Sequence, residues 1–388
     1  MEFIEQGNIV NKKVILRLDL NVTIKDNVIL DDTKLKKCIP TIKYLLNNNN
    51  HILIMSHLGK IKTEEDKQKN SLKIVSERLS ELLDHFIMFI PNTRGEELNG
   101  ALNIFDIVLM ENTRFEDLDN KRESKCDDEL AKYWSTLGDV YVNDAFGTSH
   151  RKHASTYGIS KYLPSYYGFL INEELIGLEP IINVKERPFS VIMGGAKVDD
   201  KIVLIKTLLN ECDYLLVGGG IANTFLKAKG YNIGLSLHSE DYVGEIKELI
   251  EKYPDKIYMP LDVIVKEHNE IKCYEVDKTT PDSIIYDIGP KTLDMYREIL
   301  NKSKIIFVNG TMGLYEQEEF KNGTENIYQC IAQSDAICIA GGGDALASIN
   351  NLGYKSDFDF LSTGGGATLE YIANKKIAIF EDWLWYWY

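Results

Sequence analysis

Short runs of β-branched and apolar residues recur along the chain, and longer stretches with apolar residues at helical spacing lie between them. This alternation is typical of βαβ units, in which parallel strands are joined by helices. The pattern predicts an α/β protein built on parallel sheets.

The predicted strands of the two halves end in different kinds of loop. In the first half they run into charged or polar segments: VILRLDLNV (14–22), HILIMSHLGK (51–60), IVLMENTRF (107–115) and VYVNDAFGTSHRKH (140–153). In the second half they run into glycine: VIMGGAK (191–197), YLLVGGGIANTF (214–225), IIFVNGTMG (305–313), AICIAGGGDA (336–345) and DFLSTGGGATLE (359–370). Because ligands bind at the carboxyl ends of parallel strands, we expect one binding edge in each of two domains.

The glycine loops favour a nucleotide or polyphosphate site. Glycine after a strand lets the backbone approach a ligand, and the helix that follows offers unpaired N–H groups. One such loop often only terminates a strand, but five are harder to explain that way. They match neither the Walker phosphate loop nor the dinucleotide fingerprint G-x-G-x-x-G. The missing G-x-G-x-x-G fingerprint argues against a nicotinamide-dependent dehydrogenase, which is kept as one alternative.

Charged residues beside the glycine loops suit phosphate chemistry. Lys197 and Lys201 stand four apart in GGAKVDDK, so we expect them on one face of a helix that begins near Ala196. They are interpreted as cations for phosphate oxygens, and the alternative is a solvated pair balanced by neighbouring aspartates. Asp344 follows a glycine run and suits a magnesium–nucleotide contact, or alternatively caps a helix.

The loops of the first half collect polar and basic side chains. Together these residues are typical of a site for a small phosphorylated, carboxylate-bearing substrate. They are Asp19, Asn21, His57, Arg114, His150, Arg151 and His153, with Lys34 and Lys60 nearby.

The charge balance limits the partners. The 388 residues carry 44 Lys+Arg against 59 Asp+Glu, a net charge of −15, which argues against binding to nucleic acid or an anionic membrane. Residues 1–62 instead hold ten basic against six acidic residues, an excess of four positive charges. A small anion is therefore expected to bind in the N-terminal part.

The remaining features are those of an ordinary cytoplasmic protein. The six cysteines show no zinc-like spacing and are expected to be buried, reduced thiols. The first residues lack a secretory pattern, and no apolar run is long enough to span a bilayer.

In order along nearly its whole length, the chain resembles the phosphoglycerate kinase family. The segments that carry this resemblance are RLDLNV, SHLG, LMENTRF, VNDAFGTSHRKHAS, FLINEEL, GGAKVDDKI, VGGGIANTFLKA, DIGPKT, VNGTMGLYE, GGGD and STGGGATLE. The resemblance implies two similar-sized Rossmann-like domains, each a parallel sheet flanked by helices, joined by a hinge helix near 169–180. It places an N-terminal phosphoglycerate-binding domain at 1–168, completed by about 372–388, and a C-terminal nucleotide-binding domain at 169–371.

The resemblance also implies a reaction: reversible phosphoryl transfer between 1,3-bisphosphoglycerate and ADP, giving 3-phosphoglycerate and ATP, with Mg²⁺ as the cofactor of the nucleotide. Both nucleophiles are already ionised at neutral pH, so no general base is required, and catalysis rests on positioning and electrostatic stabilisation. The domains would have to close to bring the two edges together. The enzyme is expected to be monomeric.

By motif match, the resemblance implies three sets of site residues. The substrate-binding set is Asp19, Leu20, Asn21, Lys34, His57, Leu58, Gly59, Lys60, Arg114 and Arg151. The nucleotide-binding set is Gly194, Gly195, Lys201, Gly218, Gly219, Asn309, Gly310, Glu316, Gly342, Gly343, Asp344 and Ala345, with Asp344 serving the metal. The catalytic set is Lys34, Lys197, Gly365 and Gly366.

Four positions depart from the family pattern. Lys34 and Lys60 stand where arginines are expected, and lysine lacks the planar fork that pairs with phosphate. Thr311 replaces a proline, and Ala345 replaces a residue with a hydroxyl. These changes motivate a second alternative, a paralogue that binds both ligands but turns over poorly. The aromatic ending WLWYWY is expected to pack on the N-terminal domain, with a partner or membrane-interface contact as the alternative.

Overall fold

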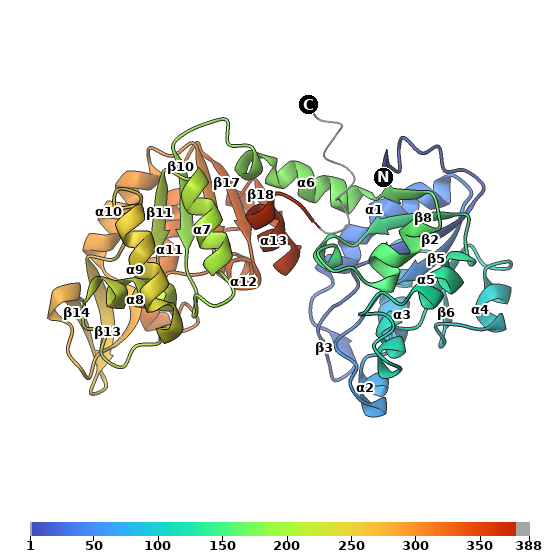
Figure 1. Cartoon of the computed structure of the whole chain (residues 1–388), viewed down its shortest axis with the longest axis horizontal. Coiled ribbons are helices and arrows are strands. Elements are labelled where there is room, and N and C mark those ends of the chain that lie inside the picture. The colour runs from blue at the N-terminus through green and yellow to red at the C-terminus, as the bar shows by residue number, and fades with distance from the viewer. Residues whose placement is uncertain (1, 378–388) are drawn as a thin grey trace. The chain divides into compact units, whose positions relative to one another are not determined.

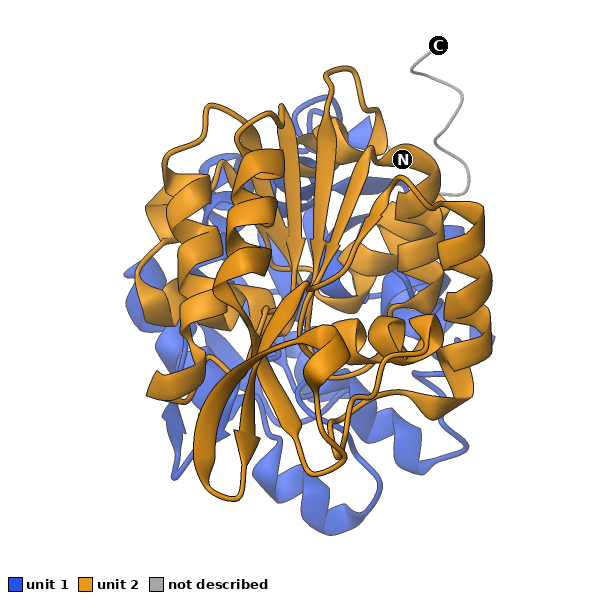
Figure 2. Ribbon diagram, turned by 90° about the vertical axis from the view of Figure 1, so that its left-hand side faces the viewer, with its two compact units in different colours: residues 1–175, 376–388 blue, residues 176–375 orange. Residues whose placement is uncertain are grey.

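The computed structural model describes residues 2–377, which divide into two units. The first unit comprises residues 1–175 with 376–388, and the second comprises residues 176–375 (Figure 2). Helix α6 (Phe169–Ile182) carries the chain from one to the other (Figure 1), at the position where the sequence predicts the connecting helix. The division falls inside this helix, whereas the motifs place it before residue 169.

The first unit is built on a seven-stranded parallel sheet in the order β1-β9-β8-β2-β5-β7-β6. Its strands are β1 (Glu2–Phe3), β2 (Lys13–Leu18), β5 (His51–Met55), β6 (Met88–Ile90), β7 (Ile107–Met110), β8 (Val140–Asp144) and β9 (Ser165–Tyr167). The central strands are buried on both faces, which explains their continuous apolar runs.

Helices on both faces of this sheet create two cores. Leu16 of β2 packs in one core with Leu35 and Leu79, whereas the next residue back, Ile15, packs in the other core with Leu130. This follows from the alternation of side chains along a strand. The helices are α1 (Thr33–Asn47), α2 (Glu64–Lys69), α3 (Lys73–Leu83), α4 (Glu96–Ala101) and α5 (Asp128–Ser135). A short hairpin, β3 (Ile24–Lys25) with β4 (Val28–Ile29), precedes α1.

The second unit contains a six-stranded parallel sheet in the order β12-β11-β10-β16-β17-β18. Its strands are β10 (Phe189–Met193), β11 (Tyr214–Val217), β12 (Ile257–Tyr258), β16 (Ile305–Asn309), β17 (Ile337–Gly341) and β18 (Phe360–Ser362). The helices are α7 (Ile202–Glu211), α8 (Gly219–Lys229), α9 (Val243–Lys252), α10 (Pro290–Leu300), α11 (Asn322–Ala332), α12 (Gly343–Leu352) and α13 (Gly366–Asn374). One core joins β16 to α10 and α11 through Ile306, Tyr296 and Ile327. The expected two α/β units with helix-flanked parallel sheets are confirmed.

A three-stranded antiparallel sheet, which the sequence pattern did not separate from the βαβ units, also belongs to the second unit. It pairs β13 (Asp262–Glu267) with β14 (Glu270–Glu275) on one side and β15 (Ile284–Ile288) on the other. Its apolar side chains Val263, Val265 and Ile285 pack against Leu226 of α8.

Three further expectations, on the helix after Gly195, the cysteines and the aromatic ending, are not confirmed by the structure. The helix expected to begin near Ala196 is wrong, because α7 begins at Ile202 and residues 198–201 form turns. All six cysteines are free, but Cys273 is exposed and Cys126 is only half-buried, so the expectation of buried thiols fails at these two positions. The aromatic ending and most of the segment 372–388 lie outside the described residues. None of the described helices is long and apolar enough to cross a membrane.

The end of β8 holds the start of α6. The Asp144 carboxylate accepts hydrogen bonds from the backbone N–H groups of Leu170 at 2.8 Å and Ile171 at 3.2 Å, which lack partners inside the helix. Gly168 leaves room for this, because a Cβ there would lie 2.3 Å from the Asp144 carboxyl carbon. Burial raises the pKa of Asp144 from its ordinary 3.8 to about 7.

Asp144 should therefore make stability depend on pH. Between about pH 4 and 7 the folded state keeps a proton on Asp144 and the unfolded state does not, so the free energy of unfolding falls as pH rises through this window. Urea unfolding of the Asp144→Asn variant should show a flatter pH dependence, whereas the Glu129→Gln variant, which alters an exposed carboxylate, should keep the wild-type slope. A wild-type slope in Asp144→Asn would contradict this assignment.

Candidate functional site: two loop clusters at sheet edges

The charged loops of the first unit lie side by side because their strands are neighbours in the order β8-β2-β5-β7. Asn21, after β2, accepts a hydrogen bond from the Gly59 N–H at 2.9 Å, and Arg114, after β7, donates to the Gly59 carbonyl oxygen at 2.8 Å. The Leu20 N–H donates to the Ser56 hydroxyl at 2.9 Å. Three loops that are distant in sequence are thus tied to one another. The sheet edge brings together the predicted residues Asp19–Asn21, His57–Gly59 and Arg114.

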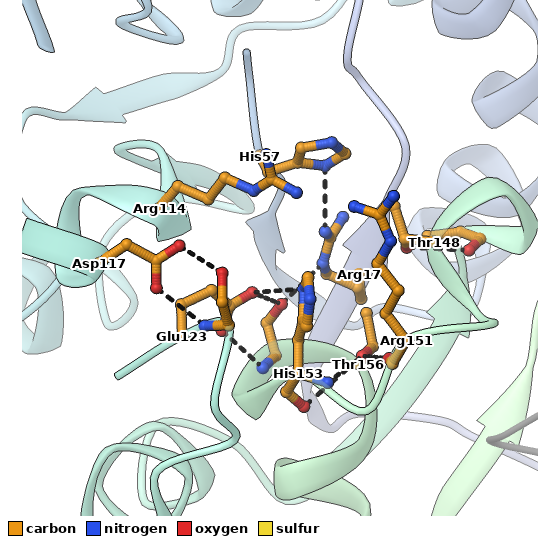
Figure 3. Close-up of polar contacts among 12 residues, drawn as sticks. Arg17, His57, Arg114, Asp117, Glu123, Thr148, Arg151, His153 and Thr156 are labelled. Atoms are coloured by element: carbon orange, nitrogen blue, oxygen red, sulfur yellow. Dashed lines mark hydrogen bonds and ion pairs between the residues drawn. The ribbon is translucent and has the colours of Figure 1, made fainter. Parts of the chain in front are cut away.

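Arg17 belongs to this edge, and the sequence reasoning missed it. Its guanidinium is almost fully buried and donates to the Ser155 hydroxyl at 2.9 Å, to the Leu18 carbonyl oxygen and to His57 Nδ1 at 3.3 Å (Figure 3). The sequence does contain a signal for Arg17: it is a single arginine inside the apolar strand VILRL, and a buried charge requires hydrogen-bond partners.

The bond from Arg17 fixes the state of His57. Arginine is always a donor, so His57 Nδ1 is the acceptor and the ring proton sits on Nε2. Burial and the charge of Arg17 hold the pKa of His57 well below its usual range. At pH 7 this side chain is a neutral hydrogen-bond donor.

Asp19 and Lys34 form an ion pair with 2.8 Å between Oδ2 and Nζ. Burial acts to raise the pKa of Asp19, but the charge of Lys34 and its hydrogen bond outweigh it, with help from the charge of Arg17, and hold the pKa below its usual value. Lys34 lies in the first turn of α1 and remains one-third exposed. The ammonium group therefore faces both Asp19 and solvent.

Arg114 and Arg151 add positive charge at the same edge. Burial and the nearby charge of Arg151 lower the pKa of Arg114, and the buried Arg114 Nε has no hydrogen-bond partner. An anion held here would both relieve the repulsion and accept from that donor. Lys60, in contrast, is exposed, and no ion pair of the described residues includes it.

The histidines of this cluster do not contribute charge. Burial and the charge of Arg151 lower the pKa of His150 to about 4, and burial and the charge of Arg17 lower the pKa of His153 to about 3. His150 accepts a hydrogen bond from Arg151 Nε at 3.0 Å, and its buried Nδ1 has no partner. The cations expected at this edge are therefore the arginines and lysines alone.

In the second unit, the glycine loops after β10, β11 and β16 pack backbone against backbone. A Cβ on Gly194 would lie 2.0 Å from the Thr311 carbonyl oxygen, and one on Gly310 would lie 2.2 Å from the Gly194 oxygen. Gly219 donates to the Met312 carbonyl oxygen at 2.7 Å, and Gly218 would overlap Met312 if it carried a Cβ. Close approach of these loops to one another thus explains several of the predicted glycines.

Other glycines face open space at helix N-termini. Gly343 begins α12 and Gly365 precedes α13, and a Cβ at either position would have no neighbour within 4 Å. The residues at the N-caps are Gly342 and Gly365, which have no side chain to accept hydrogen bonds from the N–H groups of the first turn. The unpaired N–H groups of both helices, with Gly366 in the first turn of α13, are available to an anion.

The two lysines have different surroundings. Lys201 is buried, its Nζ donates to the Gly194 carbonyl oxygen at 2.8 Å, and burial lowers its pKa while Asp200 and Asp344 oppose that shift. Lys197 is exposed on the loop after β10. The lysines do not share a helix face, but both remain beside the glycine loop.

The remaining predicted residues also lie at this edge. Asp344 is exposed in the first turn of α12, where Gly342 rather than Asp344 is the cap, and its carboxylate would lie 3.9 Å from a Cβ on Gly195. Asn309 donates to the Gly341 carbonyl oxygen at 2.7 Å, and its buried Oδ1 has no partner. Glu316 is exposed on the loop after β16.

Two departures from the family pattern lie inside the protein. Ala345 is fully buried in the apolar core of the second unit. Thr311 is buried, and its hydroxyl donates to the Gly313 carbonyl oxygen at 3.0 Å, so it stabilises its own loop.

Comparison with known proteins gives a single family. The model of the family described as phosphoglycerate kinase matches residues 4–375. Phosphoglycerate kinases of Macrococcus caseolyticus and Enterococcus faecalis are each 46% identical, over 95% and 96% of both chains, respectively. The chain belongs to the phosphoglycerate kinase family.

Solved structures of the family agree with this fold. Phosphoglycerate kinase from Coxiella burnetii aligns with a TM-score of 0.86 at 34% identity over 96% of both chains. The enzyme from Pyrococcus horikoshii aligns with a TM-score of 0.83 at 33% identity, over 98% of this chain and 97% of that one. The predicted activity, reversible phosphoryl transfer between 1,3-bisphosphoglycerate and ADP in glycolysis, is confirmed. No comparison favours the low-activity paralogue.

The two kinds of glycine should respond differently to a methyl group. Gly310→Ala would force a Cβ against the Gly194 oxygen at a φ of +90°, and we expect it to lower the free energy of unfolding by at least about 2 kcal/mol. Gly343→Ala meets no atom within 4 Å and should keep wild-type thermal stability. Thermal unfolding of both variants measures the difference, and equal melting temperatures would contradict the packing argument.

Proposed function

We propose that the charged edge of the first unit holds the phosphoglycerate and that the glycine edge of the second unit holds the nucleotide. The first assignment is supported by the cluster of Arg17, Arg114 and Arg151, whose mutual repulsion an anionic ligand relieves. The unpartnered Arg114 Nε is the observation that carries it. The second is supported by the open glycine positions at the starts of α12 and α13.

Within the first site, each group has a proposed task. Arg114 and Arg151 pair with the oxygens of the phosphate and carboxylate, since their forks match both groups. Neutral His57 donates from Nε2, and Asn21 and the backbone of Leu58 and Gly59 shape the loop around the ligand. Lys34 neutralises the acyl phosphate of 1,3-bisphosphoglycerate, and Asp19 orients Lys34.

Within the second site, Lys201 and the helix N-termini hold the phosphates of ADP and ATP. Asp344 fits Mg²⁺, because this ion takes one or two carboxylates together with phosphate oxygens and water. No cluster of three or more histidine, cysteine or acidic side chains in the described part of the chain could hold a metal alone, which agrees with a metal that arrives with its nucleotide. When bound, Mg²⁺ supplies charge neutralisation to the phosphates.

The reaction needs cations and N–H groups rather than a base. An oxygen of the ADP β-phosphate attacks the acyl phosphorus, the bond from phosphorus to the carboxyl oxygen breaks, and the carboxylate leaves as an anion. Lys197 and the N–H groups of Gly365 and Gly366 stabilise the charge on the transferring group. No proton changes place, which accords with a His57 that stays neutral.

The proposal also includes a monomeric enzyme that works in the cytoplasm, with no nucleic-acid or membrane partner. The net charge of −15 argues against a nucleic-acid or anionic membrane partner. Light scattering coupled to size exclusion measures the oligomeric state.

Steady-state kinetics with separate titrations of 3-phosphoglycerate and ATP test the two sites. Arg151→Gln should raise the KM for 3-phosphoglycerate about tenfold, the cost of one charge-assisted hydrogen bond, and leave the KM for ATP unchanged. Lys201→Gln should raise the KM for ATP and leave the KM for 3-phosphoglycerate unchanged. The assignment fails if both variants raise the same KM.

Lys34→Arg tests the lysine found at an arginine position. Arginine retains the charge facing Asp19 and adds a planar fork, so we expect turnover to rise by up to about tenfold. Lys36→Arg, in the same helix and paired with Asp32, is the matched control and should leave turnover unchanged. An unchanged or lower rate for Lys34→Arg would refute the role given to Lys34.

A further inference from the structure

Glu123 is a fully buried carboxylate in the loop that follows β7 and the short helix at Thr113–Leu118. It accepts two hydrogen bonds from Ser155, one from the backbone N–H at 3.0 Å and one from the hydroxyl at 2.5 Å. Its own carbonyl oxygen accepts from the Ala154 N–H at 2.9 Å. A carboxylate without contact to solvent is costly, so a position that keeps one calls for an explanation beyond packing.

The hydrogen bonds of Ser155 run in a single direction. Its hydroxyl has one proton, which goes to Glu123, so its lone pairs accept the Arg17 Nε–H at 2.9 Å. Another nitrogen of Arg17 donates to His57 Nδ1 at 3.3 Å. Figure 3 shows Glu123, Arg17 and His57 in this arrangement, with His153 beside Glu123 at 4.0 Å. A chain of hydrogen bonds therefore leads from Glu123 to the ring of His57.

We propose that Glu123 is a positioning residue for the phosphoglycerate site, acting through Ser155 and Arg17 to hold His57 with its proton on Nε2. This inference rests on the proposed function, which assigns the charged edge of the first unit to phosphoglycerate. Glu123 does not touch the substrate: it lies buried behind Ser155, where burial raises the pKa of its carboxyl group and the charge of Arg17 opposes that shift.

Loss of the carboxylate charge should weaken the chain of hydrogen bonds that leads from Glu123 to His57. Glutamine at 123 carries no charge and has one acceptor oxygen in place of two, so it can no longer accept from both the N–H and the hydroxyl of Ser155. Ser155 and the Arg17 guanidinium are then held less firmly, and Arg17 turns away from His57 more readily. Without a constant donor at Nδ1, the neutral His57 ring takes up both tautomers. The site then offers its Nε2 proton for only part of the time, which weakens phosphoglycerate binding but leaves the nucleotide site unaffected.

The Glu123→Gln variant tests the inference by kinetics and by ¹⁵N NMR of the histidine rings, with His57 assigned by a His57→Gln variant. We expect the KM for 3-phosphoglycerate to rise about tenfold, in line with the loss of one charge-assisted hydrogen bond, and the KM for ATP to stay unchanged. The His57 spectrum should change from a single Nε2–H tautomer to a mixture of the two.

Ser155→Ala provides a second route that keeps the carboxylate. It removes the hydroxyl between Glu123 and Arg17 and should produce the same change in KM and in the His57 spectrum. In the Glu123→Gln and Ser155→Ala double variant the two increases in KM should not add, because both substitutions interrupt the same chain of hydrogen bonds. If Glu123→Gln fails to fold, Ser155→Ala decides alone.

Asp262→Asn is the matched control. Asp262 is also a buried carboxylate that accepts from the N–H and hydroxyl of a single residue, Thr292, at 2.8 and 2.7 Å, but it lies in the second unit. Its replacement should cost stability and leave both the KM for 3-phosphoglycerate and the His57 spectrum unchanged.

The outcomes separate this inference from the proposed function. If Arg151→Gln leaves the KM for 3-phosphoglycerate unchanged, the site assignment fails, while the NMR experiment still reports on the coupling of Glu123 to His57. If Arg151→Gln behaves as expected but the His57 tautomer is unchanged in both Glu123→Gln and Ser155→Ala, the inference is overturned, even where the KM rises.

Discussion

Repulsion among like charges is the constraint on which the first unit depends. Arg17, Arg114 and Arg151 are gathered at one sheet edge, and two of them are buried, so each raises the cost of keeping the others charged. The fold meets this cost with fixed acceptors: the Ser155 hydroxyl, the Leu18 and Gly59 carbonyl oxygens and the neutral rings of His57 and His150. None of these acceptors is a carboxylate in direct contact, so the positive potential is retained for a ligand.

The second unit meets a different constraint, the space available to its backbone. The loops after β10, β11 and β16 approach so closely that a side chain at Gly194 or Gly310 would overlap a carbonyl oxygen of the neighbouring loop. Gly343 and Gly365 stand apart from this packing, because a Cβ at either position would meet no atom within 4 Å. The glycines therefore divide into those that hold the loops together and those that leave N–H groups accessible.

The chemistry of the family explains why the two edges look so different from the site of a hydrolase. Transfer between a carboxylate and a phosphate oxygen requires no proton abstraction, which agrees with a His57 whose pKa burial holds well below its usual range. A small and highly charged substrate can be bound by a few arginines although the chain as a whole is strongly acidic.

The sequence by itself determined the α/β class, the two kinds of loop at the strand ends and, through motifs in series, the family. These features depend on local patterns: apolar strands, glycine after a strand and short charged segments. The chain pattern did not reveal Arg17, because its partners Ser155 and His57 are distant in sequence and meet it only when β2, β5 and β8 pair. It also misplaced the helix after Gly195, since residues 198–201 turn to bond Ser239 rather than continue α7 upstream. Protonation states and the direction of hydrogen bonds were decided by burial, which only the tertiary structure fixes.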